Sequence, residues 1–226
     1  MSTHFIDDAF TLEIIKSSLT AIGDEMFAAL SRTSMSPIIY EALDYSVGVT
    51  DAKGDLIAQG NGTTVFLGMI DSLVKDILTK FNNEIFEGDV FLANDPYQGG
   101  GTHLSDVAIA KPVFFSDQLV AFTVNKAHWV DVGGMAPGSF TTDATEIFQE
   151  GLQLPTVKIF ERGEAINSVM DILKANIRMP DSSMGDFWAG MAANSVGESR
   201  LHELLQNYGF ETVNKAVTEL LDYRGE

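Results

Sequence analysis

The sequence predicts an α+β fold in a single domain spanning residues 1–226, and three observations lead to this prediction. Near both ends and once in the middle, apolar residues recur every three or four positions, which is typical of amphipathic helices. Short runs rich in Val, Ile, Ala and Phe lie between these segments and indicate antiparallel β-hairpins. Neither a repeat nor a linker divides the sequence, so we expect mixed helices and hairpins in one domain.

The first half of the chain alternates between the two kinds of pattern. A helix is expected over residues 10–31, where the apolar positions share one face. The period changes over residues 45–60, which predict a hairpin. A second amphipathic helix is expected over about 66–82, and after the turn at Glu87-Gly88 comes a short apolar run, Val90–Ala93.

The next two segments are expected to form one hairpin. Residues 106–115 and 118–127 are rich in Val, Ile, Ala and Phe and flank Ser116-Asp117, which fits a two-residue turn. Pro112 cannot donate to a strand ladder, so it predicts an edge strand or a β-bulge at this point.

Two glycine-rich stretches, residues 94–103 and 131–138, are expected to be loops at one end of this hairpin. Both lack Lys-Ser/Thr after the glycines, so a nucleotide phosphate loop is not expected in them. From about residue 186 to the end, the pattern predicts two helices separated by Tyr208-Gly209.

The expected hairpin brings three metal-ligand types together. Pairing about the two-residue turn puts Asp106 across from Ala127 and beside His128, and a bulge at Pro112 would put Asp106 directly opposite His128. His103 lies three residues before Asp106, where the glycine-rich loop enters the strand. Two imidazoles and a carboxylate with open positions suit a divalent cation, zinc first and manganese or iron as alternatives.

Other roles remain open for these histidines. His103 would then donate a loop-capping hydrogen bond, and His128 would be a satisfied histidine at a strand end. The two other histidines, His4 and His202, fall in the N-terminal segment and in an expected helix. With no cysteine in the chain, any metal must take imidazole and carboxylate ligands.

The charge balance limits the kinds of partner that we expect for this chain. The chain has 14 basic and 32 acidic residues, a formal net charge of −18, which argues against nucleic acid or an anionic membrane as a partner. Cations or a basic partner subunit are favoured, and the alternative is that the acidic residues only keep the surface solvated. The N-terminal segment lacks the pattern of a signal peptide or a membrane span, so a cytoplasmic location is expected.

The stretch from Asn94 to Asp106 closely resembles the signature of the hydantoinase B family, which includes parts of 5-oxoprolinases and subunits of acetone and acetophenone carboxylases. The resemblance covers essentially the whole chain. Its further motifs are Leu12-Glu-Ile-Ile, Asp24-Glu-Met, Ser31-Arg-Thr-Ser-Met-Ser-Pro37, Asp44-Tyr-Ser46, Ala127-His-Trp-Val-Asp-Val-Gly-Gly134, Pro137-Gly-Ser139, Glu146-Ile-Phe-Gln-Glu-Gly151 and Asn176-Ile-Arg-Met-Pro180.

The resemblance implies four metal ligands, Asp44, His103, Asp106 and His128. Asp44 comes from the resemblance alone, and its alternative role is that of a turn or cap residue before the first strand. Family members are longer, so the chain resembles an N-terminal portion, and a second chain that carries the C-terminal portion is one explanation. Where many members have His-His, this sequence has His128-Trp129, a variant associated with carboxylase-like members.

The resemblance also implies a function shared with an ATP-binding hydantoinase A-type subunit, which would phosphorylate a carbonyl or enol oxygen. Three hypotheses follow: a subunit of an ATP-dependent amidohydrolase for hydantoins, oxoproline or lactams, a subunit of a ketone carboxylase, or a non-catalytic, metal-stabilised assembly subunit. Asp131 is a candidate catalytic residue that would orient His128 or act as a base, or else would cap the following Gly-Gly turn. Trp129 is expected in the core rather than in a substrate wall.

Overall fold

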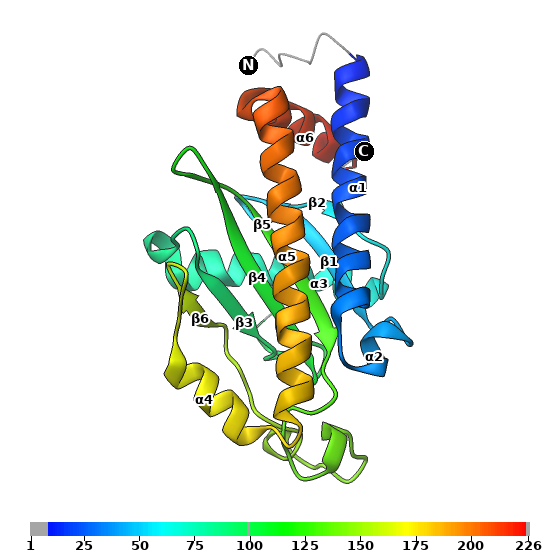
Figure 1. The fold of residues 1–226 in the computed structure, drawn as a ribbon, viewed down its shortest axis with the longest axis vertical. Coiled ribbons are helices and arrows are strands. Elements are labelled where there is room, and N and C mark those ends of the chain that lie inside the picture. Colours follow the sequence, from blue (N-terminus) through cyan, green and yellow to red (C-terminus); the bar gives the residue numbers. More distant parts are fainter. Residues whose placement is uncertain (1–8, 99, 225–226) are drawn as a thin grey trace.

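The fold is described for residues 9–98 and 100–224 in a computed structural model (Figure 1). The N-terminal segment with His4, for which no signal peptide is expected, and Gly99 lie outside the described residues. Seven strands form one antiparallel sheet in the order β2-β1-β5-β4-β3-β6-β7. The strands are β1 (Tyr45–Asp51), β2 (Leu56–Gln59), β3 (Val90–Ala93), β4 (Asp106–Phe115), β5 (Gln118–His128), β6 (Val157–Glu161) and β7 (Glu164–Ala165).

Six α-helices and three short 3-10 turns complete the described fold. The helices are α1 (Ala9–Thr33), α2 (Pro37–Tyr40), α3 (Thr64–Phe81), α4 (Asn167–Asn176), α5 (Pro180–Tyr208) and α6 (Phe210–Arg224). The 3-10 turns are η1 (Asn82–Glu84), η2 (Pro137–Ser139) and η3 (Ile147–Gln149). Within the described residues, no helix combines the length and the apolar character needed to cross a membrane.

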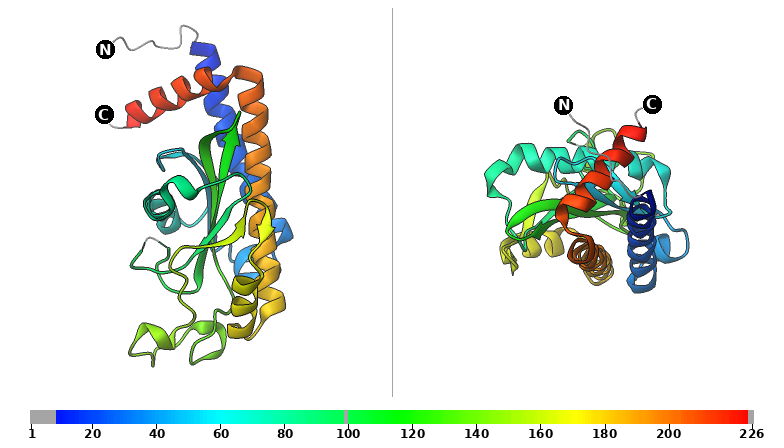
Figure 2. Two further views of the ribbon diagram at one scale, coloured as in Figure 1. Left: turned by 90° about the vertical axis from the view of Figure 1, so that its left-hand side faces the viewer. Right: turned by 90° about the horizontal axis from the view of Figure 1, so that it is seen from above.

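The sheet separates two apolar layers. The long helices α1 and α5 run side by side over one face, and α3 covers the other (Figures 1 and 2). Alternate residues of β4 follow this division: Val107 and Ile109 belong to the α1/α5 core, whereas Ala108 and Ala110 pack with α3. Even-numbered residues of β4 therefore face α3, and Asp106 is one of them.

The register of the β4–β5 hairpin confirms the expectation that a bulge lies near Pro112. Next to the Ser116-Asp117 turn, Phe114 pairs with Leu119, but beyond the irregularity Val113 pairs with Ala121, so Val120 is the extra residue. The other expectation for Pro112, an edge strand, is wrong because β4 lies between β5 and β3. The proline is tolerated because the register with β3 ends at Ala110.

The α+β class and the long elements are confirmed, whereas residues 139–185 hold elements that the periodicity did not predict. Strands β6 and β7 and helix α4 are short, so none of them spans enough residues to establish a period. The same holds for the four-residue helix α2, which lies earlier in the chain and begins at Pro37. The helix expected from about 186 begins at Pro180, because proline fits the first turn, where its missing N–H costs nothing.

Helix α1 approaches the sheet closely at one glycine. A methyl group added at Gly23 would lie 2.4 Å from the backbone carbonyl carbon and oxygen of Gln59. The carbonyl oxygen of Gly23 would in turn lie 2.5 Å from a methyl group added at Gly60. Backbone therefore packs directly on backbone here, and a side chain on either residue would push α1 away from the end of β2.

We expect Gly23→Ala to lower the free energy of unfolding by about 1 to 3 kcal/mol, since the added methyl group meets backbone that cannot rotate away. Gly68→Ala is the matched control in α3, where an added methyl group meets no atom within 4 Å. It should raise the free energy of unfolding by about 0.5 to 1 kcal/mol through helix propensity alone. Urea unfolding of both variants measures the contrast, and a stabilised Gly23→Ala protein would contradict the close approach.

Candidate metal centre

The end of the sheet where β4 begins and β5 ends gathers the four predicted metal ligands. Asp106 pairs with His128 across the two central strands, as the bulged register predicts. The backbone N–H of His128 donates to the carbonyl of Asp44 at 3.0 Å, which places Asp44 on the other side of His128, just before β1. His103 reaches the same point from the loop between β3 and β4.

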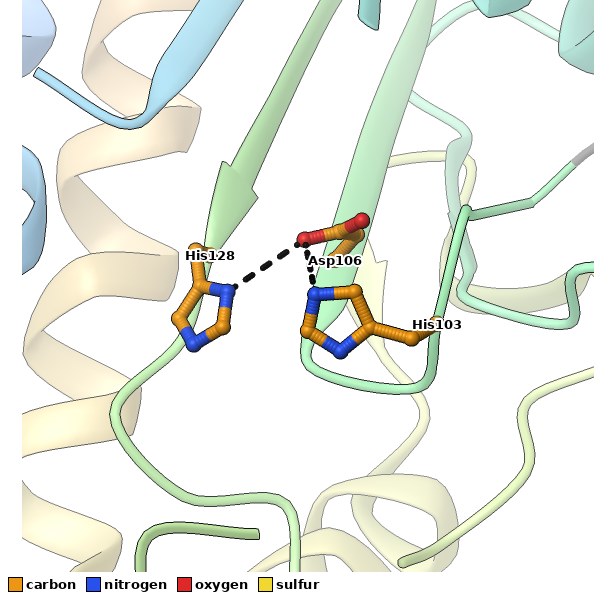
Figure 3. Close-up of side chains that lie close together, drawn as sticks. All are labelled: His103, Asp106 and His128. Carbon is orange, nitrogen blue, oxygen red and sulfur yellow. Dashed lines mark ion pairs between the residues drawn. The ribbon is translucent and has the colours of Figure 1, made fainter. Parts of the chain in front are cut away.

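Both imidazoles turn toward one oxygen of Asp106 (Figure 3). His103 Nε2 lies 3.2 Å from Asp106 Oδ1, and His128 Nδ1 lies 3.4 Å from the same atom. The two rings are 4.9 Å apart between centroids. One ligand atom from each residue lies within 4.8 Å of the other two, so the three side chains form a compact N, N, O set.

The carboxylate of Asp106 is buried, and only one of its two oxygens is held by hydrogen bonds. Its Oδ2 accepts hydrogen bonds from the Thr102 hydroxyl and, at 3.4 Å, from the Thr102 N–H. Its Oδ1 is buried, and no donor among the described residues meets it with hydrogen-bond geometry. Burial opposes the charged form, but the imidazoles of His103 and His128 and the Thr102 hydroxyl outweigh it and hold the pKa of Asp106 below its ordinary range.

Two of the three separations match a tetrahedral ion. Ligand atoms about 2.0 to 2.2 Å from a zinc ion, at tetrahedral angles, lie roughly 3.3 to 3.5 Å apart, close to the two N···O separations, whereas the three ligand atoms together lie within 4.8 Å of one another. An oxygen that is buried without a hydrogen-bond donor is the kind of group that a cation would satisfy. The same carboxylate raises the pKa of His103 against the effect of burial, as an anionic neighbour should.

Asp44 lies farther out than the other three. Its Oδ2 is 3.8 Å from His128 Nδ1, and its Oδ1 accepts a hydrogen bond of 3.3 Å from the Thr63 hydroxyl. The Asp44 side chain is 38% exposed, compared with 1% for Asp106. The structure therefore brings His103, Asp106 and His128 together as a compact group and places Asp44 at its open side.

Asp131 is tied into the loop that follows β5. Its Oδ1 accepts from the N–H groups of Gly133 and Arg178, and its Oδ2 accepts from the N–H of Gly138 and from the Arg178 guanidinium. Burial raises the pKa of Asp131, but these donors outweigh it and leave the pKa below its ordinary value. The contacts are those of the alternative role, in which Asp131 organises the Gly-Gly turn. Trp129 is buried in the α1/α5 core, as expected.

Asn94, which the sequence marked only as the start of a loop, joins the two loops around the site. It is fully buried, and its Nδ2 donates to the carbonyls of Leu104 at 2.7 Å and Leu152 at 2.9 Å. Its Oδ1 accepts from the N–H of Leu154 at 2.7 Å. One side chain thus satisfies three backbone groups and fixes the loop that carries His103 against the loop before β6.

Lys126 is a second residue that the sequence pattern did not single out. It lies two residues before His128 on the same face of β5, and its side chain is 1% exposed. Its Nζ lies 3.6 Å from Met69 Sδ and 5.7 Å from the centre of the Phe66 ring, both in α3. Burial lowers the pKa of Lys126 to about 8, and the Asp106 carboxylate offsets this only in part. The period-two alternation of β5 places it beside the site.

The model of the hydantoinase B/oxoprolinase family matches residues 8–226. The chain belongs to this family. Among its relatives, the caprolactamase subunit beta of Pseudomonas jessenii is 38% identical over 95% of this chain and 37% of its own length. The 5-oxoprolinase 1 of Arabidopsis thaliana is 32% identical over 92% of this chain and 17% of its own length. This family member therefore spans well under half the length of either relative.

Solved structures agree with this membership. The crystal structure of the ATP-dependent caprolactamase from Pseudomonas jessenii superposes with a TM-score of 0.89 at 38% identity, over 95% of this chain and 37% of that one. A nucleotide-free acetone carboxylase structure gives a TM-score of 0.86 at 18% identity, over 93% of this chain and 28% of that one. The second likeness establishes the shared fold and nothing further.

Asn94→Ala should lower the free energy of unfolding by about 3 kcal/mol or more, because it leaves the three backbone groups of Leu104, Leu152 and Leu154 without partners. Asn83→Ala, at an exposed position, is the control and should change it by less than about 0.5 kcal/mol. Chemical unfolding of the two variants checks the difference, and equal stabilities would show that Asn94 does not join the loops.

Proposed function

We propose that this chain is the metal-binding part of an ATP-dependent amidohydrolase that opens a cyclic amide, working with a hydantoinase A-type subunit that binds ATP. The observation that carries the proposal is the pair of imidazole nitrogens 3.2 and 3.4 Å from one buried carboxylate oxygen. This pair of imidazoles belongs to a chain that is 38% identical to a caprolactamase subunit.

In this proposal His103, Asp106 and His128 hold one divalent cation, and Asp44 is the fourth ligand. The N/O donor set favours zinc, with manganese or iron as alternatives. When bound, the cation would supply Lewis acidity toward the amide carbonyl or a water molecule. The chain's own residues would position it: Thr102 holds Oδ2 of Asp106, so Oδ1 is left for the cation.

Hydrolysis is favoured over ketone carboxylation by sequence similarity. The caprolactamase relative is 38% identical, whereas the likeness to acetone carboxylase, at 18%, supports the fold alone. A catalytic role for Asp131 stays a prediction. Its four hydrogen bonds favour the other role, in which Asp131 holds the loop after His128 in place.

The surface around the site supports a partner subunit. The loops at this end of the sheet, the start of α3 and η3 carry large apolar side chains that are exposed, a common property of surfaces that bind other proteins. They include Leu43, Val65, Tyr97, Phe140 and Phe148. The caprolactamase to which the chain is similar is described as ATP-dependent, and this chain lacks a phosphate-loop motif. ATP binding is therefore assigned to the partner, and the apolar loops are available to contact it.

Metal content should follow the ligand set. His128→Ala should leave the purified chain with little metal, because one of three compact ligands is gone. Thr102→Val should bind metal about 10- to 100-fold more weakly, since it frees Asp106 Oδ2, whereas Thr102→Ser keeps the hydroxyl and should bind normally. Elemental analysis and chelator competition measure both effects. Undiminished metal in His128→Ala would reject the assignment.

Activity should require both subunits. With the hydantoinase A-type partner, ATP and a lactam or hydantoin, we expect ring opening together with ADP release, and neither subunit should suffice alone. Carboxylation of a ketone with bicarbonate, without amide hydrolysis, would replace this proposal with the carboxylase alternative. Metal binding without turnover of either substrate class would favour a non-catalytic assembly role.

A further inference from the structure

Lys126 is a buried lysine whose ammonium group forms no ion pair among the described residues, although the Asp106 carboxylate acts on it from farther away. Its side chain is 1% exposed, and no carboxylate among residues 9–98 and 100–224 lies within ion-pair distance of its Nζ. What it contacts instead is a thioether sulfur and an aromatic ring, Met69 and Phe66, both weak partners for an ammonium group. A charge buried in this way opposes folding, so a functional reason for it should be sought.

The position of Lys126 in the sheet gives that reason. Across β1, β5 and β4 it forms a row with Ser46 and Ala108, directly behind the row of Asp106 and His128. Residues two apart on one face of a strand are separated by about 6.6 Å, a distance comparable to the length of the lysine stem. Its two row neighbours, Ser46 and Ala108, are small, so neither of them blocks a rotamer of Lys126 that points toward the metal ligands.

We propose that Lys126 binds an oxyanion, a phosphate or carboxylate group of a ligand, next to the candidate metal centre. The proposal rests on the proposed function for its location and for the anions that it names. Opening a cyclic amide breaks the C–N bond, adds the oxygen of water to the carbonyl carbon and produces a carboxylate, while the amine takes up a proton. ATP-dependent chemistry brings phosphate groups to the same reaction. Both supply the anionic oxygen that the ammonium group lacks.

The experiment measures binding of inorganic phosphate and of acetate by titration calorimetry, with and without added zinc. The wild-type chain should bind at least one of these anions. Lys126→Met, which keeps the length of the side chain but removes the charge, should bind it at least about tenfold more weakly, the effect of losing one charge-assisted hydrogen bond. Lys53→Met, at an exposed lysine in the β1–β2 turn at the other end of the sheet, is the matched control and should bind normally.

Thermal unfolding separates this role from a structural one. Removing an uncompensated buried charge should raise the melting temperature of Lys126→Met, whereas a lysine that stabilises the fold would give a lower one. Lys126→Gln serves as a second variant if the Met protein does not fold. The anion that binds in a Lys126-dependent way identifies the source of the oxyanion.

Two results would overturn the proposal: the wild-type chain binds neither anion, or Lys126→Met and Lys126→Gln bind as tightly as the wild type. The measurements of metal content do not depend on either of these two results. A wild-type chain that binds phosphate but no zinc would reject the metal centre and retain the oxyanion site, and metal binding without anion binding would do the reverse. The zinc content of the same Lys126 variants is therefore measured as well.

Discussion

The register between β4 and β5 is the constraint on which the candidate site depends. Side chains alternate faces along a strand, so a slip of one residue would turn Asp106 toward α1 and α5 and away from His128. The extra residue Val120 sets the register, because it shifts the pairing between the turn and the far end of the hairpin. The same strand β5 pairs with β1, so a register error would also move Asp44 away from His128.

Around that hairpin, buried polar groups hold the loops together, in addition to the apolar contacts of Leu104, Trp129 and Val132 with the α1/α5 core. Asn94 bridges two loops through three hydrogen bonds, and Asp131 gathers N–H groups from both sides of the turn that follows His128. Gly133 and Gly134 adopt φ values of 92° and 86°, which a side chain would strain. Such a network favours one loop arrangement strongly, because each broken contact leaves a buried group unpaired.

The sequence was sufficient for the parts of the site that follow from local periodicity. The alternation in 106–115 and 118–127, the two-residue turn and Pro112 together predicted that Asp106 and His128 are neighbours. Asp44 could not be found this way, because its place depends on the pairing of β1 with β5, a contact between distant segments, and it was predicted from family resemblance alone. The burial of Lys126 likewise depends on how α3 crosses the sheet, and Asn94 on a loop whose path no period describes.

The distribution of charge connects these features. In a chain with a formal charge of −18, the candidate centre is a place where positive charge is buried. Under the proposed ligand set, two carboxylates balance a divalent cation and the imidazoles are neutral ligands, so the Lys126 ammonium group leaves one positive charge uncompensated. Electrostatic interactions are strong where water is excluded, and a single anionic group on a ligand would restore neutrality.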